Sequence, residues 1–261
     1  MDSAIQTRAW TSAGISHPGH QRQRNEDAWL ARPEAGLWLV ADGLGGHDDG
    51  HEASQAIVDA LAYVEVEELA YLKPEIQEAQ GQEDCTKALA AYVDRVKDIL
   101  FGVNRQLHAR AAGRGQDYCI ASTVTALLSV ADRCACIWAG DSRLYVWRQQ
   151  QLFQVTRDHN LEQQWLAEGR SLEQAGTQAH VLTQAIGLGP ALQLEVRTFQ
   201  VMPGDVLLLC SDGVYRELSL EEIARWMELG DPGKIVRALS DQVLRGAARD
   251  NLTAVAVRVG N

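Results

Sequence analysis

Four short acidic segments, far apart in this sequence, have the composition of a site for hard divalent cations. Asp42, Asp212 and Asp250 each adjoin an apolar run of strand-like composition, and the fourth segment holds Glu26 and Asp27. The apolar runs cover residues 37–40, 206–210 and 252–259. Because carboxylates at the ends of buried strands can hold hard divalent cations, we expect the four segments to meet at one point.

The chemistry that fits such a cluster is phosphoryl transfer without a nucleophilic side chain. Two metal ions ~3.5–4 Å apart can make hydroxide from water and neutralise phosphate oxygens. We expect Asp42 to bridge two Mg²⁺ or Mn²⁺ ions, and the carbonyl oxygen of Gly43 to join one shell because glycine has no side chain to block it. Asp212 and Asp250 are expected to complete the shell of the second ion.

Arg22 is the candidate phosphate clamp, because the planar fork of an arginine can donate two hydrogen bonds to one phosphate. Arg24, two residues away, is the rival for this role. Glu26 and Asp27 follow directly, and adjacent acids of this kind can orient metal-bound waters without binding the ion.

Length and composition predict one large globular domain of the whole chain, 1–261. The sequence has 261 residues, of which 46% are hydrophobic and 23% charged. The formal net charge of −11, without a block of Lys or Arg, argues against nucleic acid as a partner. No apolar run approaches the ~20 residues of a membrane span, and the N-terminus lacks a signal-peptide pattern, so we expect no membrane insertion and a cytoplasmic protein.

Five cysteines without a Cys-x-x-Cys pair indicate reduced thiols. Cys134 and Cys136 lie in an apolar run, which favours buried core over a metal or redox role. Seven tryptophans fall within strand-like and helix-like patterns, which favours packing over a carbohydrate or nucleic-acid platform.

Hydrophobic periodicity predicts the elements that position these residues. The expected strands cover residues 10–15, 28–30, 37–41, 121–130, 135–139, 144–147, 194–201, 206–210 and 252–259. The expected helices cover residues 53–64, 89–107, 161–168, 220–228 and 235–244. Residues 73–86 are predicted to be an exposed connector, 139–143 the tight turn of a hairpin, and 156–190 an inserted subdomain.

Runs of strands with helix pairs inserted after them predict an α+β fold. We expect two antiparallel β-sheets packed as a central sandwich, flanked by helix pairs in an α-β-β-α order.

Several motifs in order, spanning 14–259, resemble the metal-dependent Ser/Thr phosphatases of the protein phosphatase 2C type. They are Arg22-x-x-x-Glu26-Asp27, Val40-Ala41-Asp42-Gly43-Leu44-Gly45-Gly46, Ala139-Gly140-Asp141-Ser142-Arg143, Ser211-Asp212-Gly213 and Asp250-Asn251. The resemblance implies a β-sandwich with a two-metal centre at one end, at which a metal-activated water hydrolyses phosphoserine and phosphothreonine.

Position by position, the resemblance assigns Asp42 to both metals, the Gly43 carbonyl to one, and Asp212 with Asp250 to the other. It associates Asp141 with a third, weaker metal found in bacterial members, and residues 156–187 with a flap beside the site. Leu44 stands where animal members carry a histidine proposed as general acid, which indicates a bacterial type.

The compact chain resembles phosphatases that oppose a Ser/Thr kinase, including ones associated with type VI secretion. Phosphorylated proteins are the implied partners.

Other interpretations of single motifs stay open at this point. Asp141 lies in a segment that would make a good hairpin turn without a metal. His47 and His51 have the spacing of zinc ligands on a helix, although solvent-facing or capping roles are favoured beside an oxygen-rich site. His159 is expected to organise the entrance to the flap. A catalytically weak phosphoprotein-binding or scaffold protein is the alternative to the enzyme as a whole.

Overall fold

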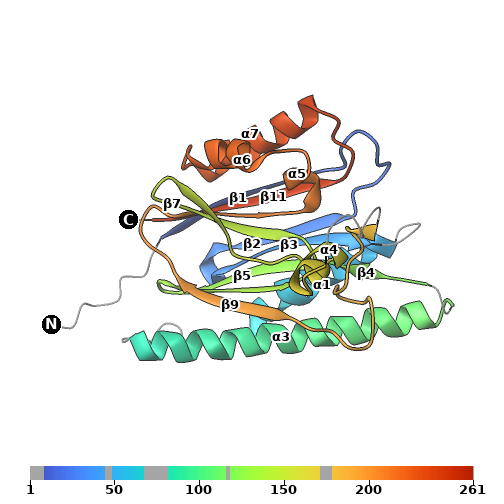
Figure 1. Cartoon of the computed structure of the whole chain (residues 1–261). Helices are drawn as coiled ribbons and strands as arrows, with labels where there is room; N and C mark the ends of the chain where they lie inside the picture. The colour runs from blue at the N-terminus through green and yellow to red at the C-terminus, as the bar shows by residue number, and fades with distance from the viewer. Residues whose placement is uncertain (1–8, 45–48, 68–81, 116–117, 171–177, 261) are drawn as a thin grey trace.

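The computed structural model describes residues 9–44, 49–67, 82–115, 118–170 and 178–260. Figure 1 shows four layers, in which two β-sheets lie face to face and helices cover both outer faces. This is the α+β sandwich that the sequence predicts. None of the helices in the described ranges combines the length and the apolar character that a bilayer crossing needs.

All strand pairs in the two sheets are antiparallel. The five-stranded sheet has the order β1 (Trp10–His17), β11 (Leu252–Val259), β10 (Val206–Cys210), β7 (Arg143–Arg148) and β8 (Gln151–Gln154). The other sheet has the order β2 (Asp27–Arg32), β3 (Leu37–Leu44), β5 (Val124–Val130), β6 (Arg133–Ala139) and β9 (Glu195–Gln200), and the short β4 (Ala121–Ser122) also pairs with β3.

Each sheet has its own helices, as Figure 1 shows. The sheet that contains β3 is covered by α1 (Asp49–Glu67) and α3 (Gln82–Ala112). The five-stranded sheet is covered by α5 (Asp212–Tyr215), α6 (Leu220–Met227) and α7 (Pro232–Arg245). A short helix, α4 (Leu161–Ala167), lies between β8 and β9, and the 3-10 turn η1 (Pro33–Ala35) joins β2 to β3.

Two of these helices begin where local signals place them. Ser219 and Glu222 form a reciprocal capping box at the start of α6. Asp231 caps α7 by accepting a hydrogen bond from the Lys234 N–H, with Pro232 in the first turn.

Alternation along the strands divides the core into three layers. In β3, Leu37, Leu39 and Ala41 face the helices, whereas Trp38 and Val40 face the other sheet. By the same alternation, Asp42 is the next residue of β3 that faces the other sheet, close to the end of the strand. The same inter-sheet layer contains Cys134 and Cys136, which confirms the prediction of buried core thiols. The seven tryptophans are buried or half-buried, which confirms packing roles.

The predicted hairpin at residues 139–143 is wrong. β6 pairs with β5 and β9 in one sheet, whereas β7 pairs with β10 and β8 in the other. Residues 139–143 therefore carry the chain from one sheet to the other. A short Gly-containing turn between two strand patterns does not distinguish these connections, because both reverse the chain.

The predicted connector at residues 73–86 extends too far along the chain, because α3 already begins at Gln82. Residues 68–81 lie outside the described residues.

The hairpin in this region is formed by β7 and β8. It closes through a two-residue turn at Gln149 and Gln150, whose φ values of 50° and 61° lie in the left-handed region. Glutamine gives no signal for such a turn, which is why the sequence did not predict it.

We expect Gln150→Gly to raise the free energy of unfolding by about 0.5–1 kcal/mol, because glycine adopts a positive φ without the strain of a side chain. Urea denaturation would measure the change. Gln151→Gly, one residue further and inside β8, is the matched control and should lower stability. Equal effects of the two substitutions would contradict the strain assigned to the turn.

Candidate active site

Strand pairing brings Asp27 and Asp42 together. Asp27 begins β2 and lies directly opposite Asp42 of β3 in the antiparallel register. Asp27 is buried, and its Oδ1 has no hydrogen-bond partner among the described residues. Two acids therefore lie side by side at one end of one sheet.

The other sheet contributes Asp212 and Asp250 at the same end. Asp212 begins α5 directly after β10, and Asp250 lies two residues before β11, which pairs with β10. The Ser211 hydroxyl donates a hydrogen bond to Asp27 Oδ2 (2.7 Å) and accepts one from the Thr253 N–H (2.9 Å). This serine connects the two acidic strand ends across the sandwich.

Asp141 approaches from the segment that crosses between the sheets. Its neighbour Ser142 shares a hydroxyl–hydroxyl hydrogen bond with Thr123 (2.8 Å), and Thr123 Oγ1 accepts a hydrogen bond from the Asp42 N–H (3.0 Å). The buried Asp141 is thereby held beside the Asp42 backbone. The structure thus brings Asp27, Asp42, Asp141, Asp212 and Asp250 to one end of the sandwich.

Glycine is required at both Asp-Gly steps because the chain packs too closely for a side chain. A Cβ at Gly43 would overlap the carbonyl oxygen of Gly50, which lies in the first turn of α1. A Cβ at Gly213 would overlap the carbonyl oxygen of Asn251. The absence of a side chain therefore lets the backbone after Asp42 pack closely against α1, and the backbone after Asp212 pack closely against the residue before β11.

Asn251 holds the loop between β1 and β2 at the site, a role that the sequence pattern did not predict. Its side-chain oxygen accepts a hydrogen bond from the Glu26 N–H (2.8 Å). Its amide donates to the carbonyl oxygens of Pro18 (3.0 Å) and Arg24 (2.8 Å). The pattern Asp-Asn before a strand was visible, but nothing local shows that this asparagine reaches residues more than 200 positions away.

Burial of several like charges raises the pKa values of the site acids. Desolvation, with repulsion from neighbouring acids, raises the pKa of Asp42 well above its usual 3.8. Desolvation raises the pKa of Asp27 to about 6 and that of Asp212 to about 7, while Ser211 and Arg216 respectively oppose the shift. The pKa values of Asp141 and Glu26 are also raised, mainly by burial. A polyvalent cation would relieve this repulsion.

Arginines neutralise part of this charge. Arg22 Nη2 lies 2.7 Å from Asp250 Oδ2, which places the predicted phosphate clamp at the acids. Arg22 and its rival Arg24 are both exposed, so exposure does not distinguish them. Arg216 lies 2.9 Å from Asp212 and 3.1 Å from Asp141, and the sequence analysis did not single it out. Its position four residues after Asp212, one helical turn away, was the signal that could have found it.

The donors fit a hard divalent cation, although their side chains are not yet arranged around one. Within the described ranges, no three His, Cys, Asp or Glu side chains converge as a ready metal site. Asp250 instead pairs with Arg22, and Asp212 and Asp141 both pair with Arg216. Even so, the unpartnered Asp27 Oδ1, the raised pKa values and the all-oxygen donor set match Mg²⁺ or Mn²⁺.

The entrance to the predicted flap is fixed to the site by His159. Its N–H donates to the Gly140 carbonyl (2.9 Å), and its ring accepts from the Gly140 N–H (3.3 Å). Next to it, the buried Asp158 forms a bidentate ion pair with Arg143, whose guanidinium lies 3.6 Å from the ring centre of Tyr215. These contacts join the start of the flap to the crossing segment and to α5.

The far end of the flap is fixed to α3 by Asn104. Its side-chain oxygen accepts a hydrogen bond from the Gly187 N–H (2.7 Å), and its amide donates to the Gly189 carbonyl (3.0 Å). Ser122 and Ile186 also exchange backbone hydrogen bonds (2.8 and 2.9 Å).

The structure also places His51 and Leu44, two further positions considered in the sequence. His51 is exposed on α1, as the solvent-facing interpretation predicts, and its possible partner His47 lies outside the described residues. Leu44 is half-buried at the end of β3, beside Gly43.

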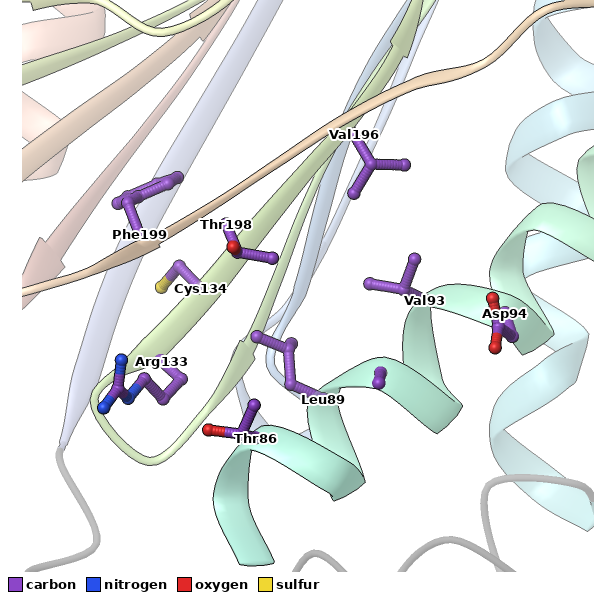
Figure 2. Close-up of a pocket in the computed structure, with 10 residues that line it drawn as sticks. Thr86, Leu89, Val93, Asp94, Arg133, Cys134, Val196, Thr198 and Phe199 are labelled. Atoms are coloured by element: carbon purple, nitrogen blue, oxygen red, sulfur yellow. The ribbon is translucent and has the colours of Figure 1, made fainter. Parts of the chain in front are cut away.

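A pocket of about 260 Å³ lies away from these acids. Figure 2 shows Leu89 and Val93 of α3 facing Val196 and Thr198 of β9 across it. Its lining includes Arg133, the first residue of β6, whereas Asp141 follows the opposite end of that strand. The pocket is therefore separate from the acidic centre.

Comparison with known proteins identifies the architecture. A sequence model of the family described as Protein phosphatase 2C matches residues 13–253. The chain belongs to the protein phosphatase 2C family.

Relatives of this phosphatase 2C chain share most of its length. It is 31% identical over 95% of its residues to the serine/threonine protein phosphatase PstP of Mycobacterium tuberculosis, and the match covers 44% of that longer protein. The structure of PppA, described as a key regulatory component of T6SS in Pseudomonas aeruginosa, covers 98% of this chain and 100% of PppA at 35% identity, with a TM-score of 0.83. The structure of the PstP catalytic domain in complex with two manganese ions covers 98% of this chain and 100% of its own chain. The identity is 28% and the TM-score is 0.77.

The raised pKa of Asp42 gives a testable pH dependence for the metal-free protein. The folded state binds the proton more tightly than the unfolded chain, so the contribution of Asp42 to stability is fully present below about pH 4 and is lost as the pH rises through the raised pKa. Asp42→Asn removes this charge. We expect its melting temperature in EDTA to exceed that of the wild type at pH 7.5 by a few degrees, at about 2–4 °C per kcal/mol, and the gain to shrink toward pH 4.5.

Thermal denaturation at several pH values would measure this gain. Asp98→Asn on the exposed face of α3 is the matched control and should show little change. A stabilisation of Asp42→Asn that is the same at every pH would contradict the assignment to charge repulsion.

Proposed function

We propose that this protein is a metal-dependent phosphatase that hydrolyses phosphoserine and phosphothreonine in proteins. The observation that carries the proposal is the convergence of five aspartates, from chain segments far apart in sequence, at one end of a phosphatase 2C sandwich. The relative crystallised with two manganese ions supports Mn²⁺ or Mg²⁺ as the cofactor.

In this proposal, each acid has a defined part. Asp42 would be a ligand shared by two cations, the Gly43 carbonyl would be a further ligand of one of them, and Asp212 with Asp250 would hold the other. When bound, the cations would lower the pKa of a water and neutralise phosphate oxygens. Glu26 and Asp27 orient water: Asp27 is buried between the sheets, and the Glu26 backbone is held by Asn251. Asp141 belongs to a third, weaker site.

Arg22 is suited to bind the phosphate of the substrate. Its side chain is 54% exposed, and its ion pair with Asp250 holds it at the acids. A cation held by Asp250 would weaken this ion pair, and the Arg22 guanidinium would then be able to donate two hydrogen bonds to a phosphate.

The proton for the leaving serine or threonine oxygen must come from a group other than residue 44. Leu44 cannot donate a proton, so we propose that water or another group protonates the leaving oxygen.

We propose a cytoplasmic enzyme that opposes a bacterial Ser/Thr kinase. The serine/threonine phosphatase relatives support the substrate class. The likeness to PppA supports a place in type VI secretion control. Residues 156–187, beside the acids, are proposed as the flap that meets the phosphoprotein.

Asp42→Ala and Asp212→Ala should each reduce phosphatase turnover by about 10³-fold or more, because each removes a charged oxygen from the cation centre. Phosphate release from a phosphothreonine peptide with saturating Mn²⁺ would measure the loss. Asp98→Ala, an exposed acid on α3, is the matched control and should leave turnover unchanged. Near wild-type turnover of either folded site variant would overturn the assignment, and phosphopeptide binding by a wild type without turnover would favour the scaffold alternative.

Arg22→Ala should raise KM more than it lowers kcat, because the arginine binds ground-state and transition-state phosphate about equally. Arg24→Ala is the matched comparison and should have the smaller effect, since the structure places Arg22 against Asp250. Steady-state kinetics on the same peptide would separate the two, and a larger loss with Arg24→Ala would reverse the assignment.

A further inference from the structure

Arg216 holds together two of the site acids that come from different parts of the fold. Its Nη1 lies 2.9 Å from Asp212 Oδ2, and its Nη2 lies 3.1 Å from Asp141 Oδ2. Asp212 follows β10 of one sheet, whereas Asp141 follows β6 of the other. One guanidinium therefore lies where two carboxylates from the two sheets face each other.

The backbone fixes this arginine in place. Arg216 is the C-cap residue that directly follows α5, and its backbone N–H donates to the Asp212 carbonyl (2.9 Å). The preceding Tyr215 packs beneath the guanidinium of Arg143, which is itself paired with the buried Asp158. Gly213 packs against the Asn251 backbone. The short helix is thus held on two sides, and the Arg216 side chain, 38% exposed, projects from a rigid support.

The charge of Arg216 serves the same purpose as a cation at this position. Asp141 and Asp212 are buried, and desolvation raises their pKa values, while Arg216 is the first favourable charge that opposes the shift in each. A divalent ion on the same two carboxylates would lie within a few ångströms of the guanidinium. The guanidinium and the ion would also need the same carboxylate oxygens, Asp212 Oδ2 and Asp141 Oδ2, so the two compete for this pair.

We propose that the Arg216 guanidinium is the resident cation of the Asp141–Asp212 pair, and that a third divalent ion binds Asp141 only by displacing it. The proposal deepens the proposed function and rests on its two-cation centre. It explains why a third site would be weak, because its ligands already have a counter-ion within the chain. Metal concentration and the position of the Arg216 side chain then decide which cation pairs with Asp141 and Asp212.

The test counts bound Mn²⁺ by calorimetry and by the electron paramagnetic resonance signal of free Mn²⁺, in wild type and Arg216→Gln. We expect Arg216→Gln to bind its weakest Mn²⁺ about tenfold more tightly or better, because it removes a like charge. Arg216→Lys keeps the charge but not the fork, and should show a smaller gain. Arg225→Gln, with the same charge loss at an exposed position of α6, is the matched control and should bind as the wild type does.

Asp141→Asn in the Arg216→Gln background should abolish the gain, which assigns the tightened ion to this pair. Unchanged Mn²⁺ affinities in a folded Arg216→Gln variant would overturn the proposal. If that variant instead showed only a higher KM for the phosphopeptide, Arg216 would be a phosphate-binding residue, which also overturns it. Failure of the wild type to bind any Mn²⁺ would refute the two-cation centre itself, a result separate from the others.

Discussion

Repulsion among carboxylates that cannot move apart is the constraint on which the rest of this structure depends. The antiparallel register fixes Asp27 opposite Asp42, and the packing of two sheets fixes Asp212 and Asp250 beside them. The sandwich must be stable enough to keep these charges together. Three apolar layers, including an inter-sheet core around Trp38, Cys134 and Cys136, supply that stability.

Neutral hydrogen-bonding side chains hold the acids close together although the charges of the acids repel one another. Ser211 and Thr123 each connect an acid on one element to the backbone or side chain of another. Asn251 makes three such hydrogen bonds to one loop, the connection between β1 and β2. None of these residues changes its charge near neutral pH, so the scaffold around the site keeps its hydrogen bonds whether the acids are protonated, paired with arginine or bound to cations.

Much of the fold and the acidic centre was readable from the sequence because both depend on short local patterns. Period-2 runs located the principal strands, helical spacing located α1, α3, α6 and α7, and an Asp beside a buried run located Asp42, Asp212 and Asp250. What could not be read depends on which strands become neighbours. The segment around Asp141 looked like a hairpin because a sheet crossing uses the same turn residues. Arg216 and Asn251 looked ordinary because their partners lie on elements that only the packed sandwich brings close.

The segment that we propose as a flap is attached to the sandwich near both of its ends. Its start is fixed by Arg143, Asp158 and His159, and its end by Asn104 of α3. β8, before the flap, lies in one sheet, and β9, after it, lies in the other. None of these attachments uses a side chain of the five site aspartates. In the proposed enzyme, substrate preference can therefore change in evolution, or by grafting, without altering the side chains of the acidic centre.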